Sequence, residues 1–98
     1  MRLEEGEVRA IKAAALHAFG PDAVVRLFGS RADDRRKGGD IDLHIEVPSN
    51  VDVWETRSRF EDNLFARIER QRDDTIVRRQ DDPRSGIDLV AYRDGVVL

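Results

Sequence analysis

Hydrophobic residues recur along this chain with two different periods, and each period predicts a type of element. From Leu3 to Phe19 the apolar positions are three and four residues apart, which is typical of one face of an amphipathic helix, and Gly20-Pro21 would end that helix. The same spacing predicts a second helix from Val51 to Gln71. The apolar positions are Val8, Ile11, Ala15, Ala18 and Phe19 in the first helix, and Val53, Trp54, Phe60, Leu64, Phe65 and Ile68 in the second.

Short, mostly apolar runs predict three strands. They extend from Ala23 to Phe28, from Asp40 to Val47 and from Asp73 to Arg79, and Pro48-Ser49-Asn50 would end the second. Between the first two strands, Ser30 suits the N-cap of a short helical turn over residues 31–35, followed by a loop at Lys37-Gly38-Gly39. Residues 80–86 form a polar loop after the third strand.

The tail from Ile87 to Leu98 fits two structures. Its residues Gly86 to Tyr92 could form a strand. Ser85 as N-cap, a stripe at Ile87, Val90 and Ala91, and Gly95 as the stop fit a short helix equally well.

The order helix, strand, turn, strand, helix, strand and tail predicts a compact α/β (α+β) sandwich in which helices on one side cover a small mixed sheet. The chain of 98 residues is expected to form one domain, residues 1–98. Trp54, Phe60, Leu64 and Phe65 are expected in its core or on a face for a partner.

Composition excludes several classes of protein. Lys and Arg number 17 against 20 Asp and Glu, a net charge of −3, which argues against strong non-specific binding of nucleic acid. The chain has no cysteine, so disulfides, thiol catalysis and cysteine-bound zinc are excluded. No apolar run approaches the ~20 residues that a membrane span needs. The acidic start is unlike a signal peptide, and we expect a cytoplasmic protein.

Two acidic residues stand out within the second predicted strand. Asp40 and Asp42 are one residue apart, so alternation along the strand puts both carboxylates on one face of the sheet, where they repel each other. A divalent cation would remove that repulsion, and Mg²⁺ prefers oxygen ligands and commonly brings phosphates with it. The pattern indicates metal-assisted phosphoryl or nucleotidyl transfer. His44 shares this face by alternation and is expected at the rim of the sheet, with tuning of the site as the alternative.

The segment GSRADDRRKGGDIDL, residues 29–43, resembles the GS…DxD signature of minimal nucleotidyltransferases in the DNA polymerase β-like superfamily. The resemblance covers the whole chain in element order but is specific only from Phe28 to Glu46. It implies that Gly29 and Ser30 hold the triphosphate of ATP, with Arg31 beside them, and that Asp40 and Asp42 bind two Mg²⁺ ions. The loop over residues 31–39 is one residue shorter than in many members of the family, a deletion that a glycine loop can absorb.

The family also uses a third carboxylate, on a neighbouring strand. By element order we expect Asp74, at the head of the third strand, to supply it, with Asp88 as the alternative because its surroundings copy those of Asp42. Asp73 would take the position if the strand register shifted by one residue. Choosing Asp74 makes residues 86–95 a terminal helix.

The resemblance further implies a biological role. Small proteins of this kind are often encoded beside a HEPN-domain ribonuclease toxin, and act as its antitoxin by adding AMP to it. The short chain has no helical domain to complete an acceptor site, so a macromolecular acceptor is expected. The alternative is a module whose catalytic site has decayed and which neutralises its partner by binding alone.

Overall fold

One mixed sheet organises the chain in the computed structural model, which describes residues 3–29, 41–69 and 73–98. Within these ranges the chain forms three helices and four strands: α1 (Glu5–Phe19), β1 (Val24–Phe28), β2 (Ile41–Val47), α2 (Val53–Arg67), β3 (Asp73–Arg79), α3 (Gly86–Asp94) and β4 (Val96–Val97). The compact α/β class predicted from the sequence is confirmed.

The strands lie in the order β3-β2-β1-β4. β1 is antiparallel to both β2 and β4, whereas β3 runs parallel to β2. The parallel pair needs a crossover connection, and α2 supplies it. Two hydrogen bonds close this crossover: the Gln80 backbone N–H donates to the Val47 carbonyl at 2.8 Å, and Arg79 Nε donates to the Val51 carbonyl at 2.9 Å.

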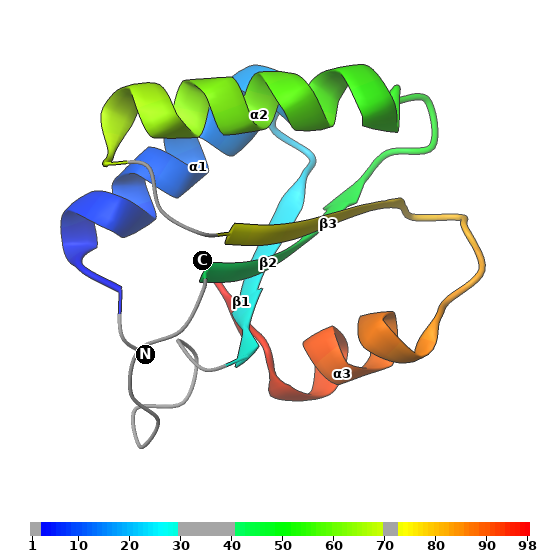
Figure 1. Cartoon of the computed structure of the whole chain (residues 1–98). Coiled ribbons are helices and arrows are strands. Elements are labelled where there is room, and N and C mark those ends of the chain that lie inside the picture. Colours follow the sequence, from blue (N-terminus) through cyan, green and yellow to red (C-terminus); the bar gives the residue numbers. More distant parts are fainter. Residues whose placement is uncertain (1–2, 30–40, 70–72) are drawn as a thin grey trace.

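The central strand β2 has one apolar and one polar face. Ile41, Leu43, Ile45 and Val47 are buried on the first face, where they join a core with side chains of α1 and α2. Asp42, His44 and Glu46 alternate with them and point to the second face. Figure 1 shows α1 and α2 together on one side of the sheet and α3 on the other. Helices therefore cover both faces, and the expectation of helices on one side was wrong.

The helices begin and end near the predicted boundaries, and caps explain the differences. The helix predicted from Val51 begins at Val53, because the Asp52 carboxylate accepts a hydrogen bond of 3.2 Å from the Glu55 backbone N–H. At its other end, residues 70–71 of the predicted helix are outside the described ranges. The tail forms helix α3, with Ser85 at its N-cap and Gly95 at its C-cap, followed by the short strand β4.

The aromatic residues of α2 differ in environment. Phe60 and Leu64 are fully buried and Phe65 packs against the core, as predicted, but Trp54 is 88% exposed and lies outside the core. None of the described helices is long and apolar enough to cross a membrane.

Replacing Phe60 or Trp54 of α2 by alanine should distinguish a core residue from a surface residue by the change in the free energy of unfolding. Phe60 touches the ring of Phe19, with centroids 5.6 Å apart, so Phe60→Ala leaves a cavity and should lower the free energy of unfolding by about 3–5 kcal/mol. Trp54→Ala should change it by no more than about 0.5 kcal/mol. Urea unfolding followed by circular dichroism measures both. Equal losses would contradict the packing described, and Phe60→Leu provides a milder variant if Phe60→Ala does not fold.

Candidate functional site

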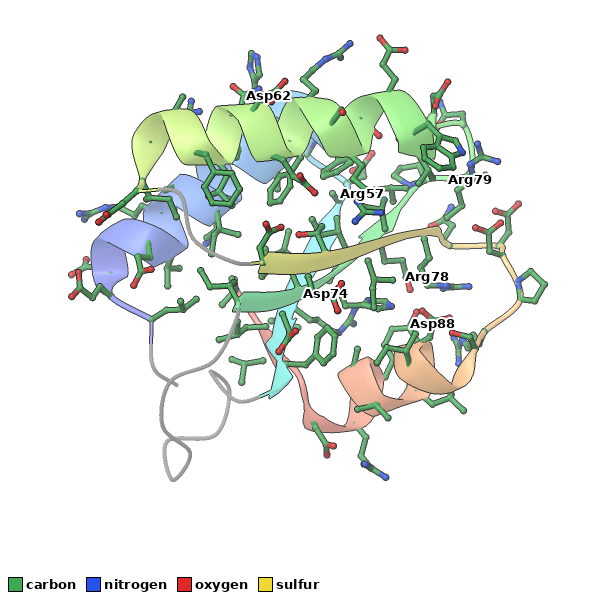
Figure 2. All side chains as sticks on the ribbon, in the orientation of Figure 1. Arg57, Asp62, Asp74, Arg78, Arg79 and Asp88 are labelled. Carbon is green, nitrogen blue, oxygen red and sulfur yellow. The ribbon has the colours of Figure 1, made fainter. Side chains whose placement is uncertain are left out.

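Three of the residues singled out in the sequence meet at one end of the sheet. Gly29 directly follows β1, whose last residue Phe28 is the register partner of Asp42 on β2. Asp42 is in turn the register partner of Asp74 on β3. Neighbouring strands are roughly 4.8 Å apart, so the two carboxylates project side by side from the same face. Figure 2 shows Asp74 on the side of β3 that faces α3.

Gly29 lies directly against Asp42. Its φ angle is +74°, in the left-handed region that favours glycine. A Cβ added at this position would lie 2.2 Å from Oδ2 of Asp42 and 3.3 Å from its Cβ. The glycine therefore lets the backbone pass close to the Asp42 carboxylate. The role in holding a triphosphate that the resemblance implies for Gly29 stays a prediction.

Other predicted site residues cannot be placed. Ser30, Arg31 and Asp40 lie outside the described residues, as do the short helical turn over residues 31–35 and the loop at residues 37–39. Their predicted roles in holding the triphosphate and the metal stay predictions.

The three candidates for the third carboxylate have different surroundings. Asp73 is the register partner of Ile41 and therefore shares the apolar face, where its carboxylate accepts a hydrogen bond of 2.9 Å from the Thr75 hydroxyl. Asp88 lies on α3, buried beneath the sheet and hydrogen-bonded to His44. Asp74 is the exposed one, and it shares a face with Asp42. The register thus favours Asp74 over both alternatives.

The pair Asp42 and Asp74 suits a hard cation. Two carboxylates on neighbouring strands supply the oxygen ligands that Mg²⁺ prefers, and a bound cation would offset their repulsion. A group of three or more acidic or histidine side chains able to hold a metal ion is not found among the described residues. Asp40, the further acid that the resemblance implies, lies outside the described residues.

Beyond Asp42, the polar face of the sheet continues into a buried network beneath α3. His44 is fully buried, and its Nε2 lies 2.7 Å from Oδ1 of Asp88. A carboxylate only accepts hydrogen bonds, so Nε2 of His44 donates this one. The histidine also packs edge-on against Tyr92, with ring centroids 5.3 Å apart. The expectation that His44 lies at the rim of the sheet was wrong, because α3 covers it.

A second part of the network joins β2, β3 and α3. Arg78 Nη1 donates to Glu46 Oε2 at 2.9 Å and to the Tyr92 hydroxyl at 2.8 Å, and the Tyr92 hydroxyl donates to Glu46. Arg78 Nε also lies 3.7 Å from Oδ2 of Asp88. In Figure 2, Arg78 and Asp88 approach each other across the space between β3 and α3. No local sequence pattern links these residues to one another. The only sign of the network in the sequence was the presence of an arginine, a glutamate and a histidine within the predicted strands.

Hydrogen bonds in this network shift the pKa of two carboxyls. For Glu46 the hydrogen bond from the Tyr92 hydroxyl, together with Arg78, outweighs burial and lowers the pKa. Burial raises the pKa of Asp88, but hydrogen bonds with the Ser85 backbone N–H, at 2.7 Å, and with His44 outweigh it, so that this pKa is also lowered. Both carboxyls are therefore ionised at neutral pH and stabilise the fold in that form.

Two hollows lie away from these residues. One, of about 400 Å³, has an apolar lining from α1, β1 and the residues around β4, including Leu16, Val24 and Val97. The other, of about 490 Å³, lies between the start of α1 and the end of α2 and is lined by Glu4, Glu7 and Arg67 among others. Asp42 and Asp74 line neither hollow.

A pair of backgrounds should isolate the contact between Gly29 and Asp42. Gly29→Ala strains a backbone with φ +74° and places a Cβ 2.2 Å from Oδ2 of Asp42. In an Asp42→Ala background only the backbone strain remains, so Gly29→Ala should cost about 1 kcal/mol less there than in the natural chain. Urea unfolding of the four chains measures the difference. Equal costs in the two backgrounds would mean that Gly29 is needed for its backbone angle alone.

Stability should fall in acid partly through Glu46. Its folded pKa lies below the ordinary value of 4.5, so its contribution is present above that value and is lost as the pH falls through the lower folded pKa. Unfolding free energies measured between pH 7 and pH 3 should decline less steeply for Glu46→Gln and Tyr92→Phe than for the natural chain. Phe60→Leu, which lowers stability without touching these groups, should keep the natural slope. An unchanged slope in both network variants would contradict this assignment.

No protein-family model matches the chain, and neither the curated proteins nor the solved structures contain a match. What the structure itself shows is a compact α/β domain, with a four-strand mixed sheet between helices in the described ranges and an acidic pair beside a close-packed glycine.

Proposed function

We propose that this protein is a magnesium-dependent nucleotidyltransferase with the polymerase β-like fold, which transfers AMP from ATP to a hydroxyl of a macromolecular acceptor. The observation that carries the proposal is the contact of Gly29 with Asp42, itself the register partner of Asp74. The absence of a side chain at Gly29 leaves room for the Asp42 carboxylate at the end of β1, and the second carboxylate comes from a strand far along the chain. Sequence spacing and sheet register thus support the same chemistry by independent routes.

The reaction assigns a role to each residue. The acceptor oxygen bonds to the α-phosphorus of ATP, the bond from that phosphorus to the oxygen bridging to the β-phosphate breaks, and pyrophosphate leaves with the electron pair. The hydroxyl proton passes to a carboxylate, and we assign this role to Asp74 because it is exposed and is the register partner of Asp42. Gly29, Ser30 and Arg31 would hold the triphosphate. Asp40, Asp42 and Asp74 would hold two Mg²⁺ ions, which neutralise phosphate charge and lower the pKa of the hydroxyl when bound.

The acceptor we propose is a HEPN-domain partner protein, with the chain acting in the cytoplasm as the antitoxin of a toxin–antitoxin pair. The described elements form a single layered domain around one core, which leaves little material for an acceptor site of its own. The acceptor hydroxyl would then be presented by the surface of another protein.

The second candidate is a module that neutralises its partner by binding alone. The exposed apolar side chains favour it, since Trp54, Leu89 and Val97 are 88%, 56% and 59% exposed. A contact surface of this kind would also serve an enzyme that modifies its partner, so only a chemical assay separates the two candidates.

Substitution of the acidic residues tests the proposed reaction. The purified chain is incubated with Mg²⁺, ATP labelled at the α-phosphate and the protein encoded by the neighbouring gene, and labelled protein is measured. Asp42→Asn and Asp74→Asn should each lower transfer by about 100-fold or more, since each removes charge that stabilises the transition state. Asp73→Asn, on the opposite face of the same strand, is the matched control and should retain transfer.

The remaining outcomes distinguish the alternatives. Transfer lost in Asp88→Asn but kept in Asp74→Asn would make Asp88 the third ligand, provided that circular dichroism shows the variant to be folded. No transfer by the natural chain, together with an intact inhibitory complex, would establish the binding module instead.

A further inference from the structure

Helix α3 turns polar side chains toward the sheet and apolar side chains outward. Asp88 is buried and Tyr92 is hydrogen-bonded beneath the sheet, whereas Ile87, Leu89 and Val90 are 41%, 56% and 37% exposed. The arrangement is the reverse of α1, which buries Ile11, Phe19 and four alanines in the core. Ala91 is the one apolar side chain of α3 that is fully buried among the described residues.

Polar contacts hold α3 to the sheet. Asp88 contacts His44 and Arg78, and Tyr92 contacts Glu46 and Arg78. The strand that follows adds a short attachment, because β4 pairs with β1 at only Val96 and Val97, and Leu98 N–H donates to the Val25 carbonyl at 2.9 Å. Among residues 85–98, only the partly buried Leu98 packs against the apolar core. In Figure 1, α3 lies apart from α1 and α2, on the opposite side of the sheet.

For the polar contacts of α3, moving the helix away from the sheet as a whole costs less free energy than removing one partner by substitution. A substitution leaves the surviving partner buried without a hydrogen bond, which is costly. When the helix moves away as a whole, water reaches both partners and replaces their hydrogen bonds. Moving α1 or α2 from the sheet would instead expose the apolar core, where no such replacement exists.

Three buried atoms also lack a hydrogen bond in the closed arrangement. Nδ1 of His44, Nη1 of Arg26 and Nε of Arg78 have no hydrogen-bond partner within the described part of the chain. Arg26 lies on β1 beside His44 on β2, and its guanidinium stacks on the ring of Tyr92, 4.8 Å from the centroid. On opening, water would reach these atoms and form hydrogen bonds with them. Their burial without a partner therefore raises the free energy of the closed form relative to the open form.

We propose that residues 85–98, the α3–β4 unit, detach from the sheet and return while α1, α2 and β1 to β3 stay folded. The open form presents Arg26, His44, Glu46 and Arg78 to solvent, directly beside Asp42. The face that carries the candidate site is then open across three strands, with Phe28 and Ile76 as apolar residues among its polar side chains. The α3–β4 unit is a cover over this face, and its opening does not depend on the proposed enzymatic activity.

Native-state hydrogen exchange of the full chain tests the opening. The amides of Leu89 and Gly95, which donate within α3 to Ser85 and Ala91, should exchange roughly 100-fold faster than those of Leu43 and Ile45 on β2. Their exchange should also depend little on low concentrations of urea, because a local opening exposes little surface. Equal protection and equal urea dependence in α3 and β2 would show that the unit opens only by global unfolding and would overturn the proposal.

A matched pair of variants tests the cause of the opening. Asp88→Asn keeps an acceptor for the Ser85 N–H but removes the charge shared with His44 and Arg78, so it should speed exchange in α3 several-fold and leave Leu43 and Ile45 unchanged. Leu89→Gln, on the exposed face of the same helix, should change neither. Acceleration of hydrogen exchange by the same factor in α3 and β2 would overturn the proposal. If Asp88→Asn does not fold, the comparison of α3 with β2 in the natural chain is the deciding measurement.

Discussion

The alternation of side chains along β2 is the constraint on which the rest of the structure depends. A strand in the middle of the sheet must bury one face, and four aliphatic residues of β2 do so against α1 and α2. The residues between them are then forced to the other face in a fixed row of Asp42, His44 and Glu46. The core and the candidate site are two consequences of one register, and a shift by one residue would destroy both.

Much of the fold could be predicted because its signals are local. The spacing of apolar residues in α1, its stop at Gly20 and the β-branched run of β3 each lie within a few residues, and β3 was predicted with the bounds that it has. The tail could not be decided in this way, because residues 86–92 fit a strand as well as a helix with a stripe at Ile87, Val90 and Ala91. The stripe also gave the wrong buried face: Ile87 and Val90 are exposed, because α3 buries an aspartate and a tyrosine against polar partners on the strands.

The candidate site could be predicted in its composition but not in its surroundings. Residues close in sequence, Gly29 and Asp42, were paired through a motif, and Asp74 was reached through the order of elements. The network of His44, Glu46, Arg78, Asp88 and Tyr92 joins three elements that are distant in sequence, and no local pattern links them. A histidine in the middle of a central strand, flanked by Leu43 and Ile45, was the available sign that another element covers that face.

The two left-handed glycines have different evolutionary consequences. At Gly20 the chain needs only the backbone angle, but φ +89° with ψ −179° is a combination essentially restricted to glycine, so a replacement there would strain the turn without touching the site. At Gly29 the space for a side chain is already filled by the Asp42 carboxylate, so any replacement must be accompanied by a change at Asp42. Among descendants of this chain, covariation of positions 29 and 42 would mark the lineages in which the carboxylate has lost its role.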